Sequence, residues 1–120
     1  MRRIRGAVSH RAGLTAEACV AAYCMRLGQE LLAERWRGGG GEIDLIARDG
    51  DEVVFIEVKK SRSFAQAAAR ISQRQIARLE AAASEFMDFL PEGQNSRVRF
   101  DVALVDGAGR IEILKNALGP

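Results

Sequence analysis

Hydrophobic and polar positions along the chain follow helical spacing in two segments and strand spacing in five. The first helical pattern begins at Thr15, a capping residue, and runs to about Leu27, where Gly28 follows as a stop. The second runs from about Ser72 to Leu90. Alternating or continuous apolar runs predict strands over residues 30–37, 42–48, 52–59, 97–105 and 110–114.

This order of elements predicts an α/β fold, with a mixed central sheet flanked by helices. A chain of 120 residues favours a single domain, residues 1–120. Residues 61–72 fit a helix, because they are rich in alanine, and equally a loop. Residues 1–11 hold four arginines and no acidic residue, so we expect a flexible basic arm. No apolar run suits a bilayer, so we expect a cytoplasmic protein without membrane contact.

One hairpin carries the polar pattern that matters most for function. Asp49 and Gly50 predict a tight two-residue turn between two strands. With that turn, Asp44 opposes Phe55 and lies diagonally across from Glu57. Residues two apart in a strand share a face, so both carboxylates lie on one face of the hairpin.

Lys59 joins Asp44 and Glu57 on that face because it follows Glu57 by two positions. The strands are apolar on both faces, so two carboxylates and a lysine at their end are costly without a ligand. Mg²⁺ or Mn²⁺ would relieve the repulsion, with the main-chain carbonyl of Val58 as a further ligand. This pattern predicts metal-dependent phosphodiester cleavage, with Lys59 orienting the water or steadying the phosphate. The alternative is a solvated cross-strand pair of Glu57 and Lys59, with Asp44 as a strand-end polar residue.

At these residues the sequence resembles the PD-(D/E)XK nuclease superfamily. The stretch GEIDLIARDGDEVVFIEVKKSR is most similar to its YraN-like branch of bacterial proteins, which are themselves similar to Holliday junction resolvases. The resemblance covers nearly the whole chain, including Glu17, Trp36-Arg37 and residues 99–102. It implies a restriction-endonuclease-like αβββαβ core around a mixed sheet.

The resemblance also implies roles for individual residues. Asp44 and Glu57 would hold the metal, and Lys59 would be the catalytic lysine. Glu17 matches a first-helix acidic residue that often completes such sites, although the helix dipole alone also favours a carboxylate there. Gln75 stands where this branch more often has lysine, and its alternative role is a satisfied amide in the core.

Two further features depart from the branch or extend it. The loop Gly38–Gly41 replaces a more polar segment, so we expect a looser mouth to the site. Fifteen of the 18 basic residues are arginine, whose planar fork suits phosphate. The candidate contacts to a DNA backbone are Arg37, Arg62, Arg74 and Arg78. Arg70, Arg74 and Arg78 recur every four residues and could together grip phosphates, and a solvated charged face is the alternative for these helical arginines.

The sequence therefore predicts a metal-dependent endonuclease acting on DNA, including branched or damaged DNA. Cleavage of two strands at a junction would require a homodimer, because one chain offers one site. A nucleic-acid-binding module of the same fold without turnover, and a structural subunit that binds neither metal nor DNA, are the competing hypotheses. The intact set of Asp44, Glu57 and Lys59 favours the enzyme.

Overall fold

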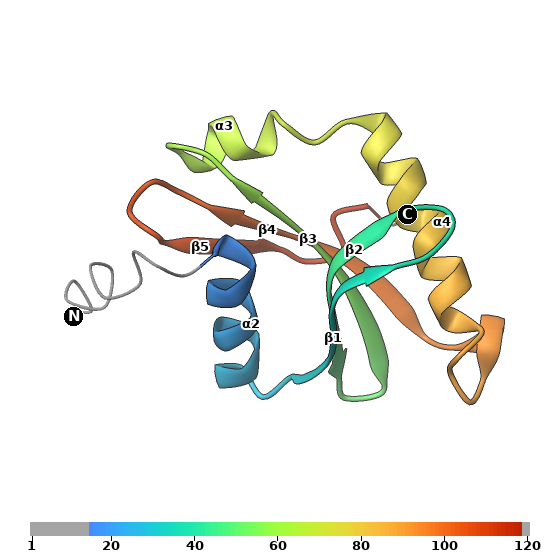
Figure 1. Cartoon of the computed structure of the whole chain (residues 1–120). Coiled ribbons are helices and arrows are strands. Elements are labelled where there is room, and N and C mark those ends of the chain that lie inside the picture. Colours follow the sequence, from blue (N-terminus) through green and yellow to red (C-terminus); the bar gives the residue numbers. More distant parts are fainter. Residues whose placement is uncertain (1–14, 119–120) are drawn as a thin grey trace.

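The computed structural model describes residues 15–118, which form a mixed α/β fold (Figure 1). Its helices are α2 (Ala16–Arg26), α3 (Phe64–Ala68) and α4 (Gln73–Met87), with a 3-10 turn, η2, at Gly93–Asn95. Its strands are β1 (Glu30–Arg37), β2 (Glu42–Asp49), β3 (Glu52–Lys60), β4 (Val98–Val105) and β5 (Ile111–Leu114). They form one sheet in chain order, in which β3 and β4 are parallel and the other neighbours antiparallel. The predicted mixed sheet flanked by helices is confirmed.

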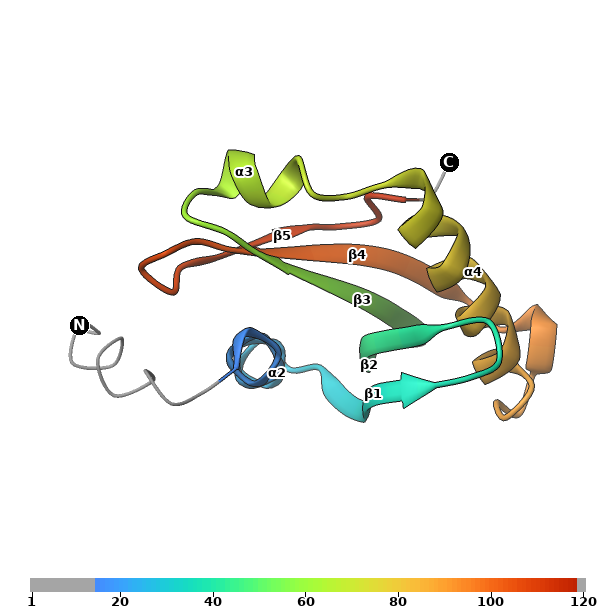
Figure 2. The same ribbon diagram turned by 45° about the horizontal axis from the view of Figure 1, so that its top comes forward.

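The sheet separates two layers of helices. Figure 2 shows α2 on one side of the sheet and α3 and α4 on the other. The layer under α2 includes Val20, Ala21, Cys24, Leu45, Val54 and Ile56. The layer under α4 includes Ile46, Val53, Phe55, Leu79, Ala82 and Ala83. Strands β2 and β3 are therefore buried on both faces, as their continuous apolar sequence predicts.

Each described α-helix begins at a hydroxyl side chain. Thr15 Oγ1 accepts the N–H of Ala18 at 3.0 Å, which satisfies a donor that the first turn of α2 leaves without a partner. Serines cap α3 and α4 in the same way. Residues 61–72, for which helix and loop both fit, contain the short helix α3 and a turn after it. None of these helices is long and apolar enough to cross a membrane, and the predicted basic arm lies outside the described residues.

The turn between β2 and β3 lies one residue later than the sequence predicts. Asp49 pairs with Glu52, so the turn residues are Gly50 and Asp51. Gly50 has a φ of 64°, which glycine adopts without steric cost and which a type II′ turn requires at its first central position. Asp49 remains in the strand, where its carboxylate accepts a hydrogen bond from Arg99 at 2.9 Å.

The predicted pairing of Asp44 with Phe55 is therefore wrong. Phe55 pairs with Ile46, which shifts the register by two positions. A shift of two leaves every side chain on its predicted face, because the side-chain period of a strand is two. Continuing the register places Asp44 opposite Glu57, nearer than the diagonal position expected, and leaves Lys59 on the same face.

Candidate functional site

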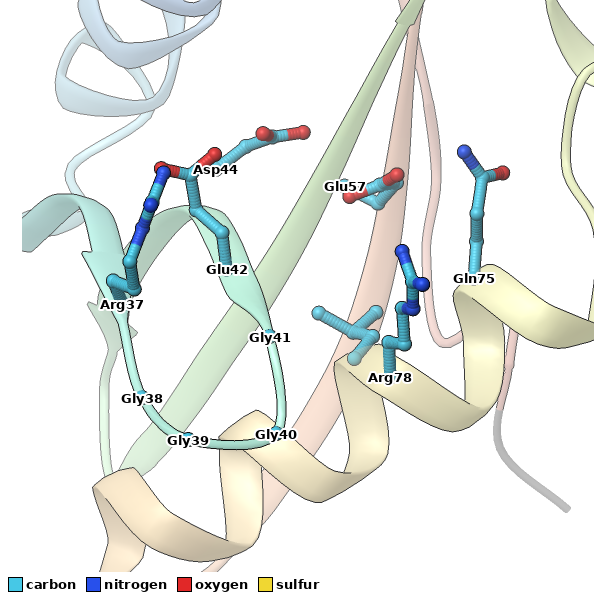
Figure 3. A pocket seen from close by; sticks show the side chains of 11 residues that line it. Arg37, Gly38, Gly39, Gly40, Gly41, Glu42, Asp44, Glu57, Gln75 and Arg78 are labelled. Atoms are coloured by element: carbon cyan, nitrogen blue, oxygen red, sulfur yellow. The ribbon is translucent and has the colours of Figure 1, made fainter.

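A cavity of about 470 Å³ opens on the α4 side of the sheet. The adjoining ends of β1 and β2 form one wall and the N-terminal half of α4 forms the other, as Figure 3 shows. Its polar lining consists of Arg37, Glu42, Asp44, Glu57, Gln75 and Arg78, and the glycine loop Gly38–Gly41 closes one end. The structure thus brings several sequence-predicted site residues from four separate elements into one cavity.

Asp44 sits where the hydrogen-bonded ladder between β2 and β3 ends. The last residue pair of that ladder is Leu45 with Ile56. Beyond it, the N–H of Val58 donates to Asp44 Oδ2 at 2.8 Å instead of to a backbone carbonyl. A side chain has therefore replaced a ladder bond, which fixes the Asp44 carboxylate at the end of the paired strands.

The surroundings of Asp44 disfavour its negative charge. The pKa of Asp44 is raised to about 7, mainly by burial and in addition by the negative charges of Glu57 and Glu17, while the hydrogen bond from Val58 acts to lower it. A carboxyl group with such a pKa is half protonated near neutrality. It is the kind of group that a bound cation converts to the charged form.

Lys59 forms an ion pair with Glu57, with Nζ and Oε2 separated by 3.0 Å. The two side chains are only 12% and 17% exposed, and both belong to β3. The alternative of a solvated cross-strand pair therefore does not fit the structure. The pair leaves one lysine against two carboxylates in a partly buried site, so the negative charge is only partly compensated.

Glu17 does not line the main cavity. It lines a second, smaller hollow of about 310 Å³ together with Lys59, Lys60 and Arg70. Among residues 15–118, no three His, Cys, Asp or Glu side chains gather as a ready metal cluster. The structure therefore does not bring Glu17 into a three-carboxylate group with Asp44 and Glu57, although its charge acts on Asp44.

The remaining donors fit a hard divalent cation. Asp44 and Glu57 supply carboxylate oxygens from adjacent strands, of the type that Mg²⁺ and Mn²⁺ prefer. The peptide group of Val58 faces β2, since its N–H bonds Asp44 there. Its carbonyl faces the same way, past the last pair of the ladder. Two carboxylates and one carbonyl thus converge where the strands stop pairing.

Gln75 has a different local role from the one predicted. Its side-chain Oε1 accepts the main-chain N–H of Ser72 at 3.3 Å, while the main-chain N–H of Gln75 donates to Ser72 Oγ at 3.1 Å. This capping box begins α4. The alternative of a satisfied core amide is wrong, because the side chain caps a helix and lines the cavity. With its oxygen engaged, the amide nitrogen is the group left to donate to a ligand.

Only two of the four predicted backbone-binding arginines line the main cavity. Arg78 lines it from α4, and Arg37 lines it from β1 while pairing with Glu42 at 3.2 Å. Arg62 and Arg74 are exposed and line neither of the two hollows. The smaller hollow instead contains Arg70, one of the helical arginines considered for phosphate contact, and Lys60, which was not among the predicted contacts. The two consecutive lysines ending β3 were a signal for Lys60.

The glycine loop is fixed, which contradicts the expectation of a loose mouth. Glu85 of α4 accepts the N–H of Gly39 at 2.8 Å and that of Gly40 at 2.6 Å. A side chain on Gly40 would come within 2.8 Å of the Ala81 Cβ, so only glycine allows this close approach. Sequence reasoning missed Glu85. Its signal was four consecutive glycines, whose free N–H groups can surround an anion.

Three curated relatives match almost the full chain. A UPF0102 protein of Cereibacter sphaeroides (strain ATCC 17025) is 62% identical and covers 93% of this chain and 96% of its own. Relatives from Ruegeria pomeroyi and Roseobacter denitrificans are 57% and 50% identical, covering 96% and 94% of this chain and 94% and 88% of their own. The model of the uncharacterised protein family UPF0102 matches residues 16–105, which contain every element from α2 to β4. The chain therefore belongs to the family UPF0102.

Proposed function

We propose that this protein is a metal-dependent endonuclease that hydrolyses phosphodiester bonds in DNA, built on a restriction-endonuclease-like core. One observation carries the proposal: Asp44, Glu57 and Lys59 meet at the end of a buried strand pair, where a side chain replaces a ladder hydrogen bond. A structural role would not require a carboxyl group whose pKa is raised to about 7 by burial and by its neighbours' charge.

Each residue has a defined task in this proposal. Asp44 and Glu57, with the carbonyl of Val58, would hold Mg²⁺ or Mn²⁺. The ion would supply stabilisation of the negative charge that develops on the scissile phosphate. Lys59 is drawn to Glu57 in the free protein, and once a cation shares that carboxylate its ammonium group is available to orient a water molecule or contact the phosphate.

Side chains around the cavity would position the DNA. The amide nitrogen of Gln75 and the guanidinium of Arg78 lie along the α4 wall, where both can donate to phosphate oxygens. Arg37 lies on the opposite wall. The loop Gly38–Gly41 is tied to α4 by Glu85, which joins the two walls at this end of the cavity. A fixed cavity with donors on both walls favours a phosphate held in one orientation.

The test is nicking of covalently closed circular DNA in Mg²⁺ or Mn²⁺, which only an endonuclease can do. We expect Asp44→Asn and Lys59→Met to abolish nicking. Asp51→Asn and Lys115→Met remove the same kinds of charge at exposed positions outside the cavity and should leave nicking unchanged. Nicking that persists undiminished in Asp44→Asn would exclude this site.

The alternative is a module of the same fold that binds nucleic acid without turnover. It is favoured by the lack, among residues 15–118, of any three His, Cys, Asp or Glu side chains grouped so that they could hold a metal ion. It predicts salt-sensitive DNA binding, because phosphate contacts release counterions, and no nicking in any divalent metal. Calorimetric titration of Mn²⁺ separates the two, since the enzyme requires binding that Asp44→Asn removes.

A further inference from the structure

The Glu57–Lys59 ion pair links two hollows, because Glu57 lines the larger and Lys59 lines the smaller. The larger contains Glu57 and has Arg78 on its wall. The smaller is lined by Lys59, Lys60 and Arg70. The 3.0 Å ion pair joins residues of both hollows. One hollow is enough for a small anion, whereas two that adjoin across the reactive residues suit a polymer with repeated phosphates.

The cations of the described residues differ in whether they have a carboxylate partner. Ion pairs engage Arg37, Lys59, Arg97, Arg99 and Arg110. Within residues 15–118, no carboxylate lies at salt-bridge distance from Lys60, Arg70 or Arg78. These three line the two hollows. A phosphate meets such cations without first breaking an ion pair, so they are the groups best prepared to bind it.

Arg70 is also held in a fixed place without losing its charge. Its Nη1 donates to the main-chain oxygen of Lys60 at 2.8 Å, which ties the segment after α3 to the end of β3. The contact uses one of five N–H donors and a neutral acceptor. Four donors and the full positive charge therefore remain for an anion in the smaller hollow, next to Lys60.

We propose that Arg78 on one side, and Lys60 with Arg70 on the other, form a track for a DNA backbone that crosses the site in both directions. The inference rests on the proposed function, because the track passes over Asp44 and Glu57. It adds Lys60 to the binding surface and places Arg70 there, so that contacts to the DNA backbone continue on both sides of the scissile phosphodiester. Binding from one side only would suit a strand end.

The experiment measures binding of a short fluorescein-labelled DNA duplex by fluorescence anisotropy, in EDTA and again in Ca²⁺. Salt is varied from about 50 to about 200 mM, so that the slope of log affinity against log salt counts the phosphate contacts. The variants are Lys60→Gln, Arg70→Gln and Arg78→Gln. Arg26→Gln and Lys115→Gln are matched controls, because both residues are exposed and lie outside both hollows.

We expect each track variant to weaken binding about threefold to tenfold and to reduce the salt slope by about one, while the controls bind like wild type. Urea unfolding of each variant verifies that the fold is retained. If wild type binds and only Arg78→Gln is impaired, the track on the Lys60 side is overturned while the proposed function stands. If wild-type protein does not bind DNA at all, the proposed function fails and the track fails with it.

Discussion

Two charged clusters lie on opposite faces of the same sheet, and they differ in how many of their carboxylates contact a cation. Under α2, Arg99 donates to Asp101 at 3.1 Å, to Glu52 at 3.0 Å and to Asp49 at 2.9 Å. Burial alone would lower the pKa of Arg99, but these hydrogen bonds outweigh it and raise that pKa. Every charge in this cluster has a partner of opposite sign.

The cluster under α4 has fewer such contacts. Lys59 pairs with Glu57 at 3.0 Å, while the Asp44 carboxylate accepts the N–H of Val58 and has no ion pair within residues 15–118, and its pKa rises to about 7. Both clusters combine one cation with more than one carboxylate, so charge composition alone does not distinguish them. The difference lies in the number and geometry of partners. We infer that the cluster whose carboxylates all contact a cation serves the fold. In the cluster where the Asp44 carboxylate contacts no cation, the electrostatic repulsion remains until a ligand relieves it.

Removing the central cation of the Arg99 cluster should have the largest effect. In Arg99→Met, Asp101 keeps the N–H of Asn116 at 2.8 Å but loses its cation, although its side chain is only 2% exposed. Breaking a buried pair from one side costs about 3–5 kcal/mol, because the other charge stays buried. Urea unfolding at pH 7 measures the loss. A loss below about 1 kcal/mol would show that water reaches Asp101, and the contrast between the clusters would fail.

Neutralising Asp44 should have the opposite effect and increase the stability of the protein. Its pKa is about 7 in the folded chain and 3.8 in the reference state, so the folded protein holds the proton more tightly. Stability is therefore lost as pH rises from about 4 to 7 and stays reduced above 7. Asp44→Asn keeps an acceptor for Val58 and escapes this loss. We expect it to be more stable than wild type by about 2 kcal/mol at pH 8 and equal to it at pH 4.

Chemical denaturation across that pH range, without divalent cations, checks the prediction for Asp44. Asp106→Asn provides the contrasting control. Burial alone would raise the pKa of Asp106, but hydrogen bonds from Arg110 and Ala108 outweigh burial and lower that pKa. Neutralising Asp106 should therefore destabilise the protein above pH 4. Equal destabilisation by both substitutions would remove the distinction between carboxylates that contact a cation and those that do not.

The comparison also shows how far the sequence could predict this molecule. The spacing of apolar residues and the capping residues located the long helices and the strands. The predicted register was wrong by two residues, but Asp44, Glu57 and Lys59 still share a face because the side-chain period of a strand is two. The sequence could not place Asp49 in the strand rather than the turn. That position depends on Arg99, 50 residues later, which holds the Asp49 carboxylate at 2.9 Å.

The same limit applies to the walls of the site. The capping box was a local signal, and Ser72 with Gln75 shows the spacing that it requires. The clamp between Glu85 and the glycine loop is not local, since 46 positions separate Glu85 from Gly39. Local patterns predicted the face that Asp44, Glu57 and Lys59 share, whereas long-range contacts decide which other groups surround them.

Loosening the glycine loop should have an intermediate effect. Glu85→Gln removes the charge and leaves one acceptor oxygen for the two N–H groups of Gly39 and Gly40. A charge-assisted hydrogen bond is worth about 1.5–3 kcal/mol, and one weaker bond remains, so we expect a loss of about 1 kcal/mol. Amide hydrogen exchange at Gly39 and Gly40 should accelerate. Glu80→Gln, at an exposed position of the same helix, is the control, and equal acceleration in both would exclude a specific clamp.

The smallest change in stability should come with a clear change in binding. Gln75→Glu keeps the acceptor for the Ser72 N–H and adds a negative charge in the first turn of α4, so stability should rise by about 0.3–0.5 kcal/mol. The same charge enters the cavity beside Glu57 and should weaken DNA binding about fivefold. Gln73→Glu gains the same helix-dipole interaction outside the cavity. Binding that falls equally in both variants, measured by anisotropy, would mean that net charge and not the site governs DNA affinity.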